Sequence, residues 1–242
     1  MGLEGQVALI SGATSGIGLA AAELLSAKGV KLVLGGQRRE ILDRHAARLP
    51  DCAVLAGDVT DAATPGALIA LALDRFGRLD IVFNNAGLIH SGAIEEIDVD
   101  QVCRMVRVNV EAAYRLAYRL AYLAVKQFRE AGRGHLVNTS SVLGTKVRLN
   151  AGAYAGTKFA IEALSEALRM ELAGSPIKVT CIEPGLVVTD LHRDHAVRPE
   201  VVQKIARPLD AQDVAAMVLY ALEQPAHIAT PRLMVLPQDQ QI

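Results

Sequence analysis

Tryptophan is absent from this 242-residue sequence and other aromatic residues are scarce, since Phe, Trp and Tyr make up only 4% of the chain while 51% is hydrophobic. The core must therefore be aliphatic. Neither charge sign is in excess, with 25 Lys and Arg against 26 Asp and Glu, so no overall field favours nucleic acid or an anionic membrane. No apolar run approaches the ~18 residues of a membrane span, and no basic segment precedes the first apolar run. We expect a soluble cytoplasmic protein with a small-molecule partner.

Cysteine is also rare, and the three thiols of Cys52, Cys103 and Cys181 form no C-x-x-C pair. Each lies in or next to an apolar stretch, so we expect reduced core thiols rather than a disulfide. His192 and His195 lack a third ligand nearby in sequence. We therefore expect no metal site, because zinc requires at least three protein ligands.

Short runs rich in Val, Leu and Ile alternate with segments of helical length. The expected strands are 6–10, 30–34, 52–56, 79–83, 135–139, 177–182 and 233–236, and the expected helices are 17–28, 40–49, 64–76, 99–131, 153–173 and 212–223. This alternation predicts right-handed βαβ units. Because no Pro/Gly/Ser-rich linker divides the chain, residues 1–242 form one α/β domain. It is a Rossmann fold: a doubly wound parallel sheet of about seven strands with helices on both faces and the ligand at the carboxyl ends of the strands.

A glycine-rich turn follows the first expected strand. In SGATSGIG, Gly12, Gly16 and Gly18 fall where the strand turns into a helix. A Cβ atom there would block the turn, the approach of a pyrophosphate or the packing of helix on strand. The helix N-terminus then offers free N–H groups to phosphates. The spacing is G-x-x-x-G-x-G and not G-x-G-x-x-G, so by itself it is a moderate signal of a nucleotide site.

The end of the second expected strand bears on the choice of cofactor. No carboxylate stands near Gly35, Gly36 or Gln37 to bind an adenosine 2′-hydroxyl, as NAD requires, and Arg38 and Arg39 follow directly. An arginine can pair with a 2′-phosphate, so the sequence favours NADP(H) over NAD(H), with Arg38 as the contact. The alternative is that these arginines only begin a solvated helix.

Polar residues follow the other expected strands as well. Asp58 could accept a hydrogen bond from an adenine amino group, and NNAG at 84–87 is a small turn that can lie against a cofactor; both are equally compatible with ordinary turns. Asn109 lies in the long expected helix, where Asn is unfavourable. Ser141 ends the fifth strand, and Tyr154 and Lys158 share one face of the next helix. These four polar side chains converge on one edge of the sheet.

The motifs together resemble the short-chain dehydrogenases/reductases. SGATSGIG is similar to that family's T-G-x-x-x-G-x-G loop with Ser11 in place of Thr, and NNAG, V-N-V, SS-x-x-G, Y-x-x-x-K and PGLVVT follow in the family's order over essentially the whole chain. The resemblance implies that a nicotinamide cofactor is held by Gly12, Ser15, Gly16, Ile17, Gly18, Arg38, Asp58, Val59, Asn85, Ala86, Gly87, Tyr154, Lys158, Pro184, Gly185, Val187 and Thr189.

The same resemblance implies the chemistry. Tyr154 is the general acid in carbonyl reduction and the base in alcohol oxidation, while Lys158 and the nicotinamide cation lower its pKa. Ser141, rather than Ser140, polarises the substrate oxygen. Asn109 shapes a proton relay behind Lys158. The implied function is NAD(P)-dependent interconversion of a secondary alcohol, hydroxy acid or polyol and its carbonyl.

Further expectations concern the substrate cover and the assembly. The segment at about 186–207 matches the family's variable substrate-covering lid, and the resemblance implies a homotetramer or homodimer in which the helices at 99–131 and 153–173 meet a neighbour. The C-terminal part of the sequence, together with IEPGLVVTD, is loosely similar to that of NADP-dependent reductases of 3-hydroxy acids and serine.

Two alternative functions are considered. A cofactor-binding regulatory protein would be expected to lack one of the four catalytic residues, and a sugar-nucleotide epimerase would need a larger C-terminal region.

The sequence departs from the family pattern at two places. Gln37 stands where an arginine would be expected for firm NADP selection. In addition, AYRLAYRLAYLA at 113–124 repeats the unit YRLA, which makes the interval after Asn109 about four residues too long. The repeat places Tyr114, Tyr118 and Tyr122 on one helical face, which we interpret as a packing stripe rather than a ligand contact. Four extra residues turn a helix by ~400° and lengthen it by ~6 Å, so the insertion is absorbed at 129–134 or moves residues near Asn109 toward the substrate.

Overall fold

The computed structural model describes residues 2–119, 122, 132–192 and 199–242. Its elements alternate between strand and helix along most of the chain. They are β1 (Val7–Ser11), α1 (Gly16–Ala27), β2 (Lys31–Gly36), α2 (Arg39–Ala46), β3 (Cys52–Ala56), α3 (Thr64–Phe76), β4 (Ile81–Asn84), α4 (Val99–Val106), η1 (Arg107–Ala112), β5 (Gly134–Thr139), η2 (Val142–Gly144), α6 (Gly152–Glu171), β6 (Ile177–Pro184), η3 (Asp190–His192), α7 (Pro199–Val202), α8 (Ala211–Glu223) and β7 (Arg232–Val235).

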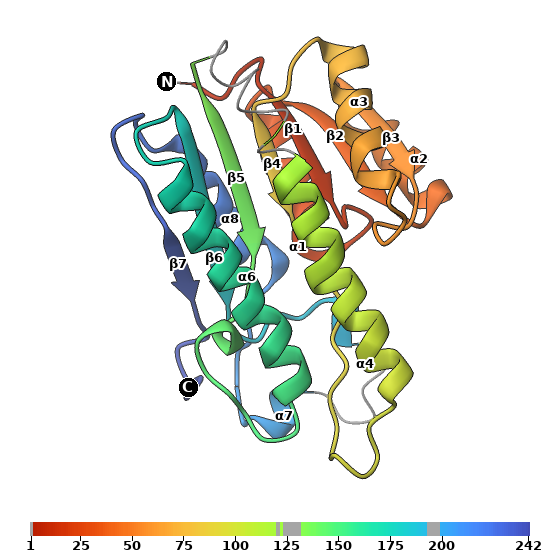
Figure 1. Ribbon diagram of the computed structural model, residues 1–242, viewed down its shortest axis with the longest axis vertical. Coiled ribbons are helices and arrows are strands. Elements are labelled where there is room, and N and C mark those ends of the chain that lie inside the picture. Colours follow the sequence, from red (N-terminus) through yellow and green to blue (C-terminus); the bar gives the residue numbers. More distant parts are fainter. Residues whose placement is uncertain (1, 120–121, 123–131, 193–198) are drawn as a thin grey trace.

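The seven strands of the described residues form one parallel sheet in the order β3-β2-β1-β4-β5-β6-β7 (Figure 1). The order reverses next to β1, because β2 pairs with one of its edges and β4 with the other, so that Ala8 lies between Leu32 and Ile81. Such a switch point separates the loops at the carboxyl ends of neighbouring strands and leaves a crevice there. The predicted doubly wound parallel sheet is confirmed.

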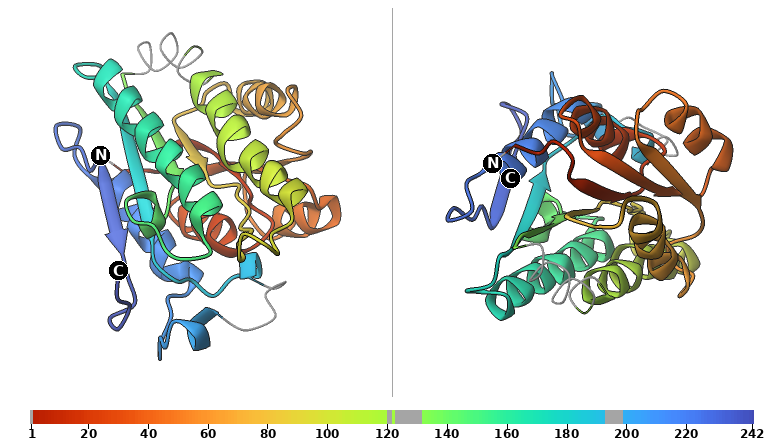
Figure 2. Two further views of the ribbon diagram at one scale, coloured as in Figure 1. Left: turned by 60° about the horizontal axis from the view of Figure 1, so that its bottom comes forward. Right: turned by 90° about the horizontal axis from the view of Figure 1, so that it is seen from above.

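Helices cover both faces of the sheet (Figure 2, right). Successive residues of a strand point to opposite faces, and the two cores divide accordingly. Ala8 and Ile10 pack on the side of α1, α2 and α8, whereas Val7 and Leu9 pack on the side of α3, α6 and residues 113–117. Strands that are buried on both faces explain why the apolar runs are nearly continuous in sequence.

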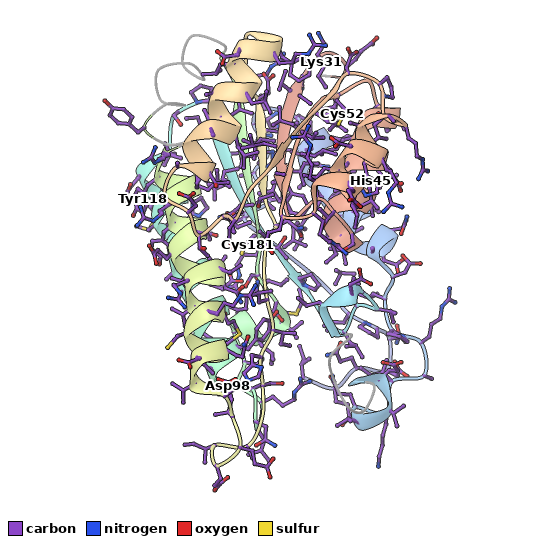
Figure 3. The ribbon with its side chains drawn as sticks, turned by 90° about the vertical axis from the view of Figure 1, so that its right-hand side faces the viewer. Lys31, His45, Cys52, Asp98, Tyr118 and Cys181 are labelled. Carbon is purple, nitrogen blue, oxygen red and sulfur yellow. The ribbon has the colours of Figure 1, made fainter. Side chains whose placement is uncertain are left out.

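The helix expected over 99–131 is more complex in the structure. Asp98, at the lower end of the helix in Figure 3, caps α4 by accepting hydrogen bonds from the backbone N–H groups of Asp100 and Gln101 at 2.9 and 3.2 Å. The helix widens into a π-helical turn at η1 and returns to α-helix over 113–119. Residues 120–121 and 123–131, which include the end of the repeated unit and the first half of the segment 129–134, lie outside the described residues.

The tyrosine stripe is a packing feature only at its first member. Tyr114 is partly buried, and its hydroxyl donates to the Ala160 carbonyl oxygen at 3.1 Å. Tyr118 stands at the surface (Figure 3), with its ring centroid 6.2 Å from that of Tyr114, and Tyr122 is 84% exposed. The stripe therefore leaves the domain core at Tyr118, and within this chain the packing interpretation is confirmed for Tyr114 alone.

The cysteines also differ from expectation in one case. Cys181 is buried at the centre of β6 (Figure 3) and Cys52 is half-buried, but Cys103 is exposed on α4. The apolar residues around Cys103 suggested a core position, yet α4 buries only Met105. All three are free thiols. None of the helices that the structure describes combines the length and apolar character that a membrane span requires.

Candidate active site

A cavity of about 700 Å³ opens at the carboxyl ends of the strands. Sixteen of the residues expected at the site line it: Gly12, Ser15, Gly16, Ile17, Arg38, Val59, Asn85, Ala86, Gly87, Ser141, Tyr154, Lys158, Pro184, Gly185, Val187 and Thr189. The other three expected residues, Gly18, Asp58 and Asn109, do not line it. One cavity thus joins the glycine-rich turn to the tyrosine and lysine of α6.

The glycine-rich turn is shaped by close backbone contacts. Gly12 has a φ of +67°, and a Cβ there would lie 2.8 Å from the Ala86 Cα. At Gly18 a Cβ would lie 2.5 Å from the Gly12 carbonyl oxygen. The absence of a Cβ at Gly18 therefore lets α1 pack closely on the glycine-rich turn at Gly12. The absence of a Cβ at Gly12 lets that turn approach the loop after β4.

Ser11 and Asn85 join the loops that follow three strands. The Ser11 hydroxyl accepts hydrogen bonds from the backbone N–H groups of Asn85 and Ala86 at 3.0 and 3.1 Å. The Asn85 amide donates to the Ser11 and Gly12 carbonyl oxygens and accepts from the Thr139 hydroxyl at 3.1 Å. A hydroxyl is sufficient for this role, which explains how serine can replace threonine at position 11.

Arg38, which lines the cavity, contacts the glycine-rich turn. Its guanidinium donates to the hydroxyls of Thr14 at 2.9 Å and Ser15 at 3.2 Å. One cation and two hydroxyls thus gather at the N-terminus of α1, a donor set that suits a phosphate group. Thr14 was not foreseen, because its role depends on the fold of the turn.

Asp58 is bonded to its own neighbours. One carboxylate oxygen accepts from the Thr60 backbone N–H and hydroxyl at 2.9 and 2.7 Å, and the other accepts from the Gln37 amide at 2.8 Å. The backbone hydrogen bond from Thr60 makes the largest contribution to lowering the pKa of Asp58. Gln37, which departs from the family pattern, therefore braces the loop after β3, and Gly57 and Val59 rather than Asp58 face the cavity.

Asn109 lies in the π-helical turn and is buried. Its Oδ1 accepts from the Leu88 N–H at 2.7 Å, and its Nδ2 donates to the Leu88 carbonyl oxygen at 2.8 Å and to the Thr157 hydroxyl at 3.1 Å. A π turn shifts the side chains that follow it relative to a regular helix, and such turns are frequent at functional sites. The turn accounts for an asparagine in a helix interior.

Tyr154 is buried at the start of α6, where its pKa is raised to about 12. Burial is the largest cause, because it disfavours the phenolate; a hydrogen bond with the Ser141 side chain and the positive charge of Arg148 act in the opposite direction. Ser141 therefore lies next to the phenol, as its expected role requires. The expected lowering by Lys158 is not among these causes, and the net shift of the Tyr154 pKa is upward.

Lys158 is buried beside the tyrosine, with its Nζ 5.6 Å from the Tyr154 ring centroid. The ammonium donates to the Thr139 carbonyl oxygen at 2.9 Å. Burial lowers its pKa to about 8, against the smaller opposing effects of Cys181 and Glu162. Lys158 therefore exchanges its proton near neutral pH more readily than an exposed lysine.

Other cavity residues were missed by reasoning from the sequence. Arg148 and His90 also line the cavity, as do Gln203 and Gln240 from the segments after β6 and β7. No local spacing marks them, because they reach the site through the tertiary fold. Among the described residues no three His, Cys, Asp or Glu side chains group as a metal site would need; His195 lies outside them.

Comparison with known proteins identifies the family. The family model described as short chain dehydrogenase matches residues 6–199. The chain belongs to the short-chain dehydrogenases. An uncharacterized oxidoreductase of Staphylococcus aureus (strain MW2) is 36% identical over 237 residues, which cover 97% of this chain and 98% of that protein. Oxidoreductase activity is thus the class that family membership supports.

Solved structures of other family members share the whole fold. The closed form of serine dehydrogenase complexed with NADP+ has a TM-score of 0.89 at 25% identity, covering 98% of this chain and 97% of that one. The 3-ketoacyl-(acyl-carrier-protein) reductase from Brucella melitensis complexed with NADH has a TM-score of 0.86 at 29% identity, covering 96% and 97%. Related short-chain dehydrogenases therefore bind either NADP or NAD.

Proposed function

We propose that this protein is an NADP(H)-dependent alcohol dehydrogenase or carbonyl reductase that interconverts a secondary alcohol, hydroxy acid or polyol and its carbonyl. One observation carries the proposal. The glycine-rich turn with Arg38 and the group formed by Tyr154, Ser141 and Lys158 line the same cavity. A cofactor that reached from Arg38 to Lys158 would place its reactive end beside the Tyr154 phenol.

The roles of the residues follow from their positions. The bound cofactor supplies the hydride in reduction and accepts it in oxidation. Tyr154 donates its proton to the carbonyl oxygen in reduction and receives it in oxidation. Ser141, whose side chain acts on the phenol to lower its pKa, also binds the substrate oxygen as negative charge develops on it.

Lys158 supports Tyr154 from behind. Its ammonium is fixed by the Thr139 carbonyl oxygen, so a positive charge faces the phenol when Lys158 is protonated. This charge favours the phenolate and brings the pKa of Tyr154 down toward the working pH. Asn109 fixes the loop at Leu88, which lines the cavity next to these groups.

The preference for NADP(H) rests on Arg38. The Thr14 and Ser15 hydroxyls that Arg38 contacts lie at the N-terminus of α1, and a 2′-phosphate bound there would receive a charge-assisted hydrogen bond. The end of β2 is Gly35 and Gly36, so no carboxylate there selects for NAD.

Assembly into a homotetramer or homodimer is part of the proposal. Large apolar side chains project from the outer faces of the helix after η1 and of α6, where Phe159 is 43% and Met170 64% exposed. These two helices lie side by side on one surface (Figure 1). Burial of such a face between copies would remove apolar area from water.

A spectrophotometric screen at 340 nm tests the function. The purified protein is assayed with NADPH and NADH over ketones, oxo acids and keto sugars, and with the oxidised cofactors over the matching alcohols. We expect NADPH-dependent turnover that falls by about 10²–10⁴-fold in Tyr154→Phe. Nearly full activity in that variant would refute the catalytic role, and NADH turnover far above NADPH turnover would refute the role of Arg38.

A further inference from the structure

Gln240 reaches the cavity from the segment that follows β7. It is half-buried, and its side-chain oxygen accepts a hydrogen bond from the Leu186 backbone N–H at 2.8 Å. The same oxygen fills the space beside Gly185, where an added Cβ would overlap it. Gln240 therefore rests on the turn between Gly185 and Val187.

The same segment also contacts the chain near α7. The Gln240 Nε2 lies 3.4 Å from the Gln203 side-chain oxygen. One residue earlier, an Asp239 carboxylate oxygen accepts from the Ala206 backbone N–H at 2.6 Å. Residues 239–240 thus join the turn at Leu186 to the stretch at 203–206, which is far from that turn in the path of the chain.

The backbone of Leu186 is held from both sides. Its N–H is bonded to Gln240, and its carbonyl oxygen accepts from the Leu209 N–H at 3.0 Å. The Val188 N–H in turn donates to the Leu209 carbonyl oxygen at 2.9 Å. These bonds fix the peptide planes around Val187, whose backbone faces the nicotinamide end of the cavity under the proposed function.

From these contacts we infer that Gln240 is a positioning residue that holds the Gly185–Val187 backbone in the orientation that binds the cofactor, and that it couples this backbone to Gln203. This inference rests on the proposed function for the identity of the ligand. A turn that is held in place before binding loses little freedom when the ligand arrives, so affinity is higher.

Two variants of Gln240 separate the hydrogen bond from mere packing. Gln240→Met keeps a side chain of similar length but removes the carbonyl oxygen, whereas Gln240→Glu keeps an acceptor for the Leu186 N–H. Gln241→Ala is the matched control, because Gln241 is the exposed neighbour and does not line the cavity.

The first measurement is hydrogen exchange of the Leu186 amide in the protein without ligand. We expect faster exchange in Gln240→Met, and protection close to wild type in Gln240→Glu and Gln241→Ala. This readout needs no activity, so it stands even if the screen finds no turnover. Unchanged exchange in Gln240→Met would overturn the inference.

The second measurement is the dissociation constant of NADPH by fluorescence titration, followed by KM and kcat on any substrate found. Loss of one hydrogen bond predicts an apparent dissociation constant and cofactor KM about 3–10-fold higher in Gln240→Met, with a smaller change in kcat. Faster Leu186 exchange with unchanged NADPH affinity would show a structural role only and would overturn the inference. Absence of NADPH binding and turnover in the wild type would instead refute the proposed function.

Discussion

The side chain of Asn109 holds the backbone of Leu88 by both of its polar atoms, one accepting at 2.7 Å and one donating at 2.8 Å. The pair joins the π-helical turn to the loop after β4, at the edge of the cavity. Because the bonds are short and Asn109 is buried, they fix the wall of the site more firmly than an exposed contact could.

Asn109→Ala should therefore destabilise the protein as well as slow it. The Leu88 N–H loses its partner, and we expect the free energy of unfolding to fall by about 1–3 kcal/mol, measured by urea denaturation. Glu111→Ala in the same turn is the control. It removes only a surface ion pair with Arg115, which changes stability by less than about 1 kcal/mol. Equal stability of the two variants would contradict a bracing role for Asn109.

Arg148→Met should change the pH dependence of alcohol oxidation. The Arg148 cation lowers the pKa of Tyr154, which burial holds at about 12, so its removal raises that pKa further. Oxidation needs the phenolate; the rising limb of kcat/KM against pH should therefore move to higher pH, whereas Arg148→Lys should keep it closer to the wild-type position. Superimposable profiles for the wild type and Arg148→Met would exclude this effect of the charge.

Lys158→Met should change how stability depends on pH. The pKa of Lys158 is about 8 in the folded protein, below the ordinary value of 10.5. Below pH 8 the lysine is protonated in both states, and its burial lowers the free energy of unfolding by on the order of 3 kcal/mol. Between pH 8 and 10.5 the unfolded state binds more protons, so this loss diminishes as the pH rises.

The wild type should accordingly gain stability relative to Lys158→Met as the pH is raised from 8 toward 10.5, measured by denaturation at several pH values. The methionine variant has no titrating group at this position, so its stability at each pH is the baseline for the wild type. A constant difference between the two proteins across this range would contradict the lowered pKa.

Arg38→Ala should raise the KM for NADPH by about 10–100-fold, as expected for loss of a charge-assisted hydrogen bond, and leave the KM for NADH nearly unchanged. Arg39→Ala is a close control, because the neighbouring arginine pairs with Asp43 on the surface and does not line the cavity. If both substitutions weakened NADPH binding equally, general charge rather than a specific contact would select the cofactor.

Much of the site was visible in the sequence because its members end buried strands or share one helical turn. Gly12, Asn85, Ser141 and Pro184 each lie at the carboxyl end of a strand, and a parallel sheet brings such ends to one edge. Tyr154 and Lys158 follow from helical spacing alone. Strand order and cavity lining therefore agree with the pattern of the motifs.

The remaining features depend on contacts that no local pattern encodes. The π turn around Asn109 left no signal beyond an asparagine in an apolar helix, and Gln240 reaches Leu186 across 54 positions of the chain. The pKa of Tyr154 is likewise not predictable from the local sequence. Its motif predicts an acid/base, but the size of the opposing effect of burial depends on what surrounds it in three dimensions.

The close packing at the end of β2 bears on how cofactor use could evolve. A Cβ at Gly36 would lie 2.6 Å from the Thr14 Cγ2, and a threonine at that place has little rotamer freedom to withdraw. A single Gly36→Asp change, the simplest route to a carboxylate there, would collide with the very residue that steadies Arg38. A carboxylate at position 36 would therefore require a change at position 14 as well, so steric epistasis opposes this route to NAD binding in addition to the charge of Arg38.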